Sequence, residues 1–182
     1  MLPGEDPDSA VLDLAAVLEG LTGDQFEILV VGDAQATADD VLARAPGLPL
    51  RVIASEAGIA AGCDAAMYDL IVVGASDGQF DVRELNHLLD AVEHGADVAA
   101  GYRPRRMDAI VRQFQRFGWR VDVDCAFVLL RRSVWRDLEA MQQRAWCCAE
   151  LLANVRRRGY QVVEVPVSHR RPTIGIETSQ AA

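Results

Sequence analysis

Short apolar runs alternate with helical patterns over the first hundred residues, and this alternation constrains the fold more than any other feature. The runs are FEILVVGD, LPLRVIAS, LIVVGAS and ADVAAGYR, which begin at residues 26, 48, 70 and 96. Each run is short and is bounded by Gly, Pro or Asp, as buried strands are. Strands that alternate with helices favour a Rossmann-like α/β fold, with a mostly parallel sheet and helices on both faces.

Four helical patterns accompany these runs. Residues 10–21 carry apolar side chains at helical spacing, after a cap at Asp8 or Ser9. TADDVLARA, with Thr37 as its expected cap, and GIAAGCDAAMYD predict two further helices. DVRELNHLLDAVEHG is amphipathic. Its apolar face consists of Leu85, Leu88, Leu89 and Val92.

The second half of the chain is less regular. RMDAIVRQFQRFGW predicts a basic helix, and RVDVDCAFVLLRRSVW predicts a strand of a mixed sheet. RDLEAMQQ and CCAELLANVRRRG predict two more helices, and YQVVEVPVSHRRP predicts a final strand. Proline has no N–H to donate, so Pro166 inside that strand indicates an edge position or an irregular ending.

The composition indicates a cytoplasmic globular protein. The 182 residues suffice for one domain with a sizeable core, and no apolar run approaches the roughly 18 residues of a membrane span. The opening MLPGEDPDSA is acidic and lacks the features of a signal peptide. The four cysteines show no CxxC spacing, which favours reduced thiols over a metal or disulfide role.

Charge is divided unevenly along the chain. Residues 1–99 carry 19 acidic residues and 3 arginines, a net −16, whereas residues 100–182 carry 8 acidic residues and 15 arginines, a net +7. The basic half could face phosphates or an anionic membrane surface, or it could simply be solvated and attracted to the acidic half. In RRMDAIVRQFQRF, apolar residues alternate with arginines, as in an interfacial helix or one packed on the sheet. The overall net charge of −9 argues against nucleic acid as a partner.

Polar residues follow three of the predicted strands. Asp33 follows the first, Asp77 the third and Arg103 the fourth. Ligands of open α/β sheets bind at the carboxyl ends of the strands. These three residues are therefore candidates for a binding site.

Five stretches, in order, resemble the inverting GT-A glycosyltransferases of family two, in particular the dolichyl-phosphate mannose synthase-like enzymes with a polyprenyl-phosphate acceptor. The stretches are FEILVVGDAQATADDVLARA, YDLIVVGASDGQF, GADVAAGYRPRR, VDVDCAFVLLRRSVW and AELLANVRRRGYQVVEVPVSHRRPTIG, and they span residues 26–175. The resemblance implies one GT-A-like domain over residues 1–182. Within it, residues 1–103 would form the nucleotide-sugar-binding half, residues 104–175 the acceptor half and residues 176–182 a mobile tail.

The resemblance also implies the ligands. A nucleotide-sugar donor would lie along the first-half strand ends, with Mg²⁺ or Mn²⁺ bridging its diphosphate and an Asp-x-Asp turn. Such cations take oxygen ligands, and they stabilise charge on a leaving diphosphate. The acceptor would be polyprenyl phosphate at a membrane surface, which would make the protein peripheral to the inner face of the membrane.

On the donor side, the family pattern is only partly present. Asp77 matches the second Asp of the metal turn, whereas Ala75 stands at the first. Asp33 matches the second Asp of the pair that holds the nucleobase end, whereas Gly32 stands at the first. Glu5 corresponds approximately to the Glu of the family's opening motif, whose Asn is missing.

Acceptor-side positions match more fully. The resemblance implies acceptor-side or catalytic roles for Asp122, Glu150 and His169, and Asp124 lies two residues after Asp122. Arg103 and Arg106 belong to a cluster after a predicted strand, and Arg171 precedes Pro172. These arginines could bind phosphate, or they could form a solvated basic surface. In the closing loop, however, Pro172 occupies the position of the family's Arg.

Two functional hypotheses follow, and they belong to different classes. The first is an active hexosyltransferase. The second is a catalytically inactive GT-A-like domain that binds a nucleotide, a sugar or a protein partner. A third interpretation is an incomplete N-terminus, because the family's opening strand is reduced here to Met1-Leu2. The sugar, the nucleobase, the acceptor, membrane contact and the oligomeric state stay open.

Overall fold

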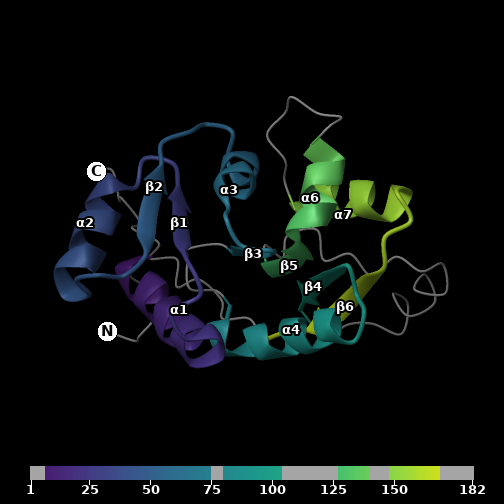
Figure 1. Cartoon of the computed structure of the whole chain (residues 1–182), viewed down its shortest axis with the longest axis horizontal. Coiled ribbons are helices and arrows are strands. Elements are labelled where there is room, and N and C mark those ends of the chain that lie inside the picture. The colour runs from purple at the N-terminus through teal and green to yellow at the C-terminus, as the bar shows by residue number, and fades with distance from the viewer. Residues whose placement is uncertain (1–6, 75–79, 104–126, 140–147, 169–182) are drawn as a thin grey trace, which may run out of the picture.

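The structure is a computed structural model, which describes residues 7–74, 80–103, 127–139 and 148–168. Its first elements are α1 (Pro7–Thr22), β1 (Ile28–Val31), α2 (Gln35–Arg44), β2 (Leu50–Ile53), α3 (Ile59–Ala65) and β3 (Leu70–Gly74). The later elements are the 3₁₀ helix η1 (Val82–Glu84), α4 (Leu85–Glu93), β4 (Val98–Tyr102), β5 (Phe127–Arg131), α6 (Arg132–Glu139), α7 (Cys148–Arg157) and β6 (Val162–Pro166). Figure 1 shows their arrangement.

The described strands form two sheets. β1 and β2 pair in parallel, and the other four strands form a sheet in the order β3-β5-β4-β6. β5 runs antiparallel to both β3 and β4, and β4 runs parallel to β6. The prediction of an α/β fold with a mixed second half is confirmed.

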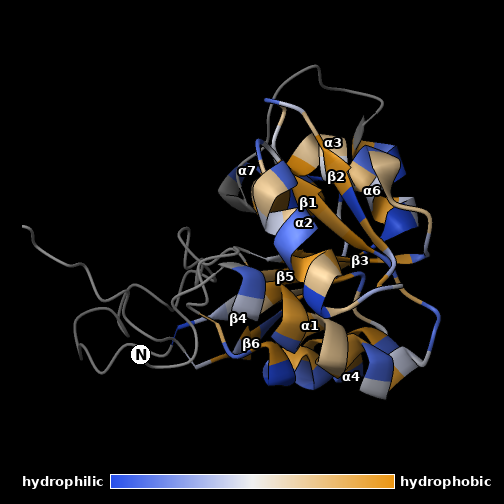
Figure 2. Ribbon diagram, turned by 90° about the vertical axis from the view of Figure 1, so that its left-hand side faces the viewer, coloured by the Kyte–Doolittle hydropathy of each residue, from blue (hydrophilic) through white to orange (hydrophobic). Residues whose placement is uncertain are grey.

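Helices cover both faces of the four-stranded sheet. In Figure 1, α6 and α7 lie above this sheet and α4 lies below it. The upper core joins α3, α6 and α7 to alternate residues of β4 and β5, such as Val98 and Val128. The lower core joins α4 to the intervening residues, such as Ala99 and Leu129. Figure 2 shows the apolar strands between helices of mixed polarity, as a sheet buried on both faces requires.

Helices also cover both faces of the two-stranded sheet. Ile28 of β1 packs into a small core with Val41 of α2 and with residues of α1. On the other face, α3 approaches β1 so closely that a Cβ added to Gly62 would lie 2.9 Å from Cγ2 of Val31. Glycine at position 62 therefore permits the contact between α3 and β1.

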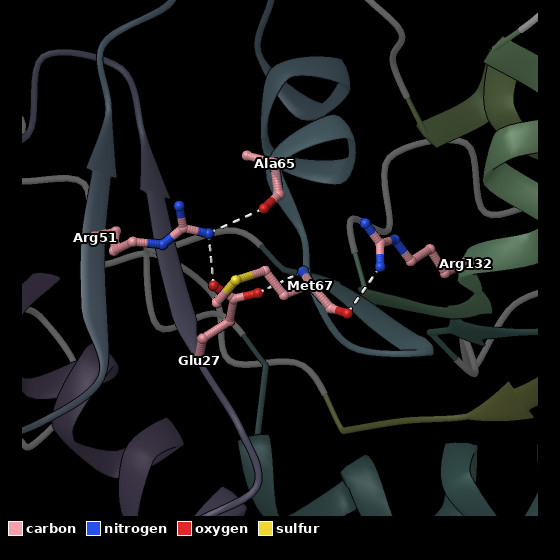
Figure 3. Close-up of polar contacts among 5 residues, drawn as sticks. All are labelled: Glu27, Arg51, Ala65, Met67 and Arg132. Atoms are coloured by element: carbon pink, nitrogen blue, oxygen red, sulfur yellow. Dashed lines mark hydrogen bonds and ion pairs between the residues drawn. The ribbon is translucent and has the colours of Figure 1, made fainter.

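A polar cluster links the two sheets, and we call it the Glu27 latch (Figure 3). The side chain of Glu27, just before β1, accepts 2.6 Å hydrogen bonds from Nη2 of Arg51 on β2 and from the backbone N–H of Met67. The same Arg51 atom donates to the carbonyl of Ala65, at 2.9 Å. Arg132 of α6 donates to the carbonyl of Met67, at 2.8 Å. Glu27 thus fastens the β1–β2 sheet to the chain that leads into β3.

Several local predictions are wrong. Thr37 does not cap α2, because the helix begins two residues earlier and its N-cap, Ala34, makes no side-chain hydrogen bond. Asp8 lies inside the first turn of α1, 4.0 Å from Arg44, and is therefore not its N-cap. Ser9 is likewise inside α1, since the helix begins at Pro7.

The elements around β3 and β5 also differ from prediction. The helix predicted from GIAAGCDAAMYD ends at Ala65. β3 is not a parallel strand buried throughout, since its described partner β5 is antiparallel and Leu70 is exposed. Of the residues RRSVW, only Arg131 belongs to the strand β5, and α6 begins at Arg132. Val134 and Trp135 are buried in the upper core as part of this helix.

Other predictions are confirmed. Leu85, Leu88 and Val92 are buried on α4, and Leu89 packs partly against them. β6 lies at the end of the four-stranded sheet, with Pro166 as its last residue. The predicted helix over RMDAIVRQFQRFGW lies outside the described residues.

Candidate functional site

The strand directions bring several chain segments to one edge of the four-stranded sheet. β3, β4 and β6 all point the same way, so their carboxyl ends share an edge with the amino end of β5. At that edge Gly74 pairs with Phe127, and Tyr102 pairs with Pro166. We call it the site edge. Segments 75–79, 104–126 and 169–182 all meet the described structure there.

Aromatic stacking brings the chain back to the site edge after β3. The rings of Phe80 and Phe127 are stacked, with centroids 5.7 Å apart and an angle of 10° between their planes. Asp81 follows and caps η1, since its Oδ1 accepts a hydrogen bond of 3.1 Å from the backbone N–H of Arg83. The described residues on either side of segment 75–79 are therefore both held at this edge, Gly74 by strand pairing and Phe80 by this stack.

A carboxylate holds the chain that leaves β6. Oε2 of Glu84 accepts a 2.6 Å hydrogen bond from the backbone N–H of Ser168, and Oε1 accepts a 2.7 Å bond from Ser168 Oγ. The preceding residue, Val167, is buried and donates its N–H to the carbonyl of Tyr102, at 2.9 Å. No local sequence pattern indicates this contact, because the two residues are 84 positions apart.

Close packing fixes β4 beside its neighbours. A Cβ added to Gly101 would lie 3.0 Å from Cγ2 of Val167 and 3.1 Å from the carbonyl oxygen of Phe127. Only glycine fits between these atoms without displacing them. Arg103 leaves the sheet two residues later and is partly buried.

Three of the predicted site residues lie in the described part of the chain. Asp33 is exposed after β1, and its carboxylate has no partner among the described residues. Arg103 follows β4 at the site edge. Glu150 is exposed in the first turn of α7, and no contact among the described residues links it to the site edge.

The other predicted site residues lie outside the described part. They are Glu5, Asp77, Arg106, Asp122, Asp124, His169 and Arg171. The strand topology nevertheless fixes where their segments start or end. Asp77 belongs to segment 75–79, which follows Gly74, and the segment with Asp122 and Asp124 precedes Phe127. His169 follows Ser168 directly.

The described residues do not themselves make a metal centre. They contain no group of three or more His, Cys, Asp or Glu side chains placed to hold a metal ion. The carboxylate expected to bind a cation, Asp77, is not among them. The two described groups with displaced pKa values, His94 and Tyr160, precede β4 and β6 and lie toward the opposite edge.

Comparison with solved structures defines the class of the fold. A glucosyl-3-phosphoglycerate synthase of M. tuberculosis matches with a TM-score of 0.63 and 15% identity, over 94% of this chain and 70% of that one. An inositol-1-phosphate CTP transferase of T. maritima matches with a TM-score of 0.57 and 12% identity, over 87% of this chain and 72% of that one. The chain therefore has the GT-A-like fold of nucleotide-diphospho-sugar transferases.

A sequence relative narrows the class to a family. The polyprenol monophosphomannose synthase of Mycolicibacterium smegmatis (strain ATCC 700084 / mc(2)155) is 30% identical over 184 residues, covering 84% of this chain and 69% of that protein. No protein-family model matches the chain. On this relationship, the chain belongs to the polyprenol monophosphomannose synthase family of GT-A glycosyltransferases.

Proposed function

We propose that the chain transfers a hexose from a nucleotide-diphosphate sugar to a polyprenyl phosphate, with inversion at the anomeric carbon. A phosphate oxygen of the acceptor attacks that carbon from the face opposite the leaving group. The new carbon–oxygen bond forms as the bond to the diphosphate oxygen breaks, and the nucleoside diphosphate departs with the electron pair. The attacking phosphate is already anionic, so the reaction needs little help from a general base.

The relationship to a polyprenol monophosphomannose synthase carries this proposal, because that protein's name specifies both the sugar and the acceptor. The strand topology supports it. Segments 75–79, 104–126 and 169–182, which hold most of the proposed site residues, meet the described structure at the site edge. Ligands of open α/β sheets bind at such an edge.

The proposed roles follow from charge. Arg103, Arg106 and Arg171 stabilise the diphosphate as negative charge develops on it. A divalent cation, Mg²⁺ or Mn²⁺, would be held by Asp77 with diphosphate oxygens and water, and it would add further positive charge there. Mg²⁺ commonly keeps several waters and binds through one or two protein carboxylates, so a single carboxylate is compatible with this role.

Other side chains serve the two ends of the substrates. Asp33 and Glu5 contact the nucleoside end of the donor. Asp122 and Asp124, with Glu150 and His169, orient the acceptor against the anomeric carbon.

The acceptor places the reaction at a membrane surface. A polyprenyl chain resides in the bilayer, and the net charge of +7 over residues 100–182 suits contact with anionic headgroups. None of the helices in the described ranges has the length and apolar character to cross a bilayer. On the chemistry of the acceptor and the charge of residues 100–182, we propose peripheral contact at the inner face.

A second candidate function is binding without turnover, and one observation favours it. Gly32 has φ of +117°, a backbone conformation that side-chain-bearing residues rarely adopt. The family's Asp at this position would be strained in that conformation. The residue after β1 thus departs from the family pattern at a position whose backbone conformation also disfavours the family's Asp.

A transfer assay separates the two candidates. Purified protein is incubated with UDP- and GDP-hexoses, each labelled in the sugar, with polyprenyl phosphate in detergent and with Mn²⁺ or Mg²⁺. Label that passes into the lipid fraction identifies donor and acceptor together. Asp77→Ala and Asp122→Asn should abolish this transfer, whereas His87→Ala, an exposed substitution on α4, should not change it.

Calorimetry with the same nucleotides completes the test. Binding without transfer by the folded protein would support the inactive GT-A-like domain. No binding and no transfer by the folded protein would refute the transferase and any nucleotide-binding role, and would leave a GT-A-like domain that binds another partner.

A further inference from the structure

Glu84 makes the most specific polar contact at the site edge, and the proposed function assigns it no role. It accepts two hydrogen bonds from one residue, Ser168, at 2.6 and 2.7 Å. One donor is a backbone N–H and the other is a side-chain hydroxyl, so the contact fixes both the position and the rotation of Ser168. Hydrogen bonds with an ionised acceptor are shorter and stronger than neutral ones.

The position of this contact in the chain gives it significance. Glu84 ends η1, which begins one residue after Asp81 and therefore shortly after the turn that carries Asp77. Ser168 directly precedes His169, Arg170 and Arg171. The bond pair thus joins the chain that returns from one proposed ligand-binding segment to the start of another.

Both partners are themselves held in place. On one side, Phe80 stacks on Phe127 of β5, and Asp81 caps η1. On the other side, the buried Val167 is hydrogen-bonded to Tyr102 at the end of β4. Glu84 therefore connects two rigid supports rather than two loose loops.

We propose that Glu84 is a positioning residue for glycosyl transfer, which holds Ser168 beside η1 and so fixes the point from which the chain continues to His169. The inference rests on the proposed function, because the segments that carry Asp77 and His169 supply charges to the same reaction. Glu84 itself touches neither substrate and acts through Ser168. Misplacing groups that act in a transition state by about 1 Å can cost on the order of 100-fold in rate.

Three variants separate positioning from charge. Glu84→Ala removes both hydrogen bonds, and we expect kcat to fall by about 10- to 100-fold. Glu84→Gln keeps an oxygen for the Ser168 N–H and gains an N–H that can donate to Ser168 Oγ, so it should restore most of the activity. Ser168→Ala removes only the hydrogen bond from the hydroxyl, so its kcat should lie between those of Glu84→Ala and Glu84→Gln. His87→Ala on the exposed face of α4 is the matched control.

Two readouts exclude a merely structural role. The KM for the donor should change by less than about threefold, because the nucleoside end does not depend on Ser168. Amide exchange at Ser168 should accelerate in Glu84→Ala by about tenfold or more, while exchange in the lower core stays unchanged. This second readout does not require activity.

The outcomes are distinct. A wild-type protein that neither binds nucleotide sugars nor transfers sugar overturns the proposed function, and this inference with it. Transfer by wild type together with undiminished kcat in Glu84→Ala overturns the inference alone. Equal losses in Glu84→Gln and Glu84→Ala also overturn it, because the charge of Glu84 would then act directly. If Glu84→Ala does not fold, Ser168→Ala and Glu84→Gln carry the same comparison.

Discussion

Removing the carboxylate of Glu27 should loosen the attachment between the two sheets. The side chain of Glu27 is 9% exposed, and its two oxygens accept bonds of 2.6 Å from Arg51 and from the Met67 N–H. A hydrogen bond to a charged group contributes about 1.5–3 kcal/mol. Arg51 is 45% exposed, so water replaces part of what Glu27→Ala removes.

We therefore expect Glu27→Ala to lower the free energy of unfolding by about 2 kcal/mol. At this chain length that corresponds to a decrease in Tm of roughly 4–8 °C. Glu27→Gln keeps an acceptor for the Met67 N–H but loses both the charge and the hydrogen bond opposite Arg51, so about half of that loss is expected. Urea unfolding followed by circular dichroism measures the free energy of unfolding of both variants.

The control is Arg83→Ala, which removes an ion pair of 3.6 Å whose arginine is 78% exposed. Such a pair should contribute less than about 0.5 kcal/mol. A double-mutant cycle with Arg51→Ala should give a coupling energy of at least about 0.5 kcal/mol, because Glu27 and Arg51 are in direct contact. Zero coupling, or a loss in Glu27→Ala no larger than in the control, would refute the role of the latch.

Three further predictions concern other parts of the molecule. The hydrogen bond to the Asp90 carbonyl and the charge of Asp90 raise the pKa of His94 above 6.5. The resulting stabilisation is complete below pH 6.5 and is lost as the pH rises through the raised pKa of His94. In an NMR titration, the pKa of His94 should therefore be lower in Asp90→Asn than in wild type, because the substitution removes the charge of Asp90. Gly101→Ala should cost about 1–3 kcal/mol in thermal unfolding because its neighbours must move, whereas Gly20→Ala, in open space on α1, should stabilise by about 0.5–1 kcal/mol. Ala75→Asp should tighten Mn²⁺ binding measured by calorimetry with donor present, by about tenfold or more, and unchanged affinity would contradict the assigned turn.

The first hundred residues were predictable because their signals are local. The apolar runs and the amphipathic stretch around Leu88 predicted β1 to β4 and α4 at nearly the observed positions. Residues 132–135 were not predictable in the same way, because their pattern suits a strand as well as a helix. Trp135 belongs to α6, where its Nε1 donates a hydrogen bond of 2.7 Å to Asp64 Oδ1, and the two residues are 71 positions apart.

The candidate site also combines features that a local sequence pattern predicts with contacts that depend on tertiary structure. The expectation that Arg103 follows a strand end required only a local pattern, and the structure confirms its position. The contact of Glu84 with Ser168 depends on how η1 and β6 meet, which no local pattern specifies. Sequence therefore identified which strand ends carry polar residues, while the partners of those strand ends came from tertiary structure.

The missing second carboxylate has a thermodynamic consequence for the proposed donor site. With Ala75 beside Asp77, the protein offers one charged oxygen ligand from this turn, and a diphosphate must supply others to complete the coordination shell. The cation should then bind weakly to the free protein and much more tightly in the presence of donor. Coupling between two ligands is reciprocal, so the cation must raise the affinity for the donor by the same factor. This coupling, rather than the affinity for either ligand alone, distinguishes a donor site that depends on the cation from one that binds nucleotides without it.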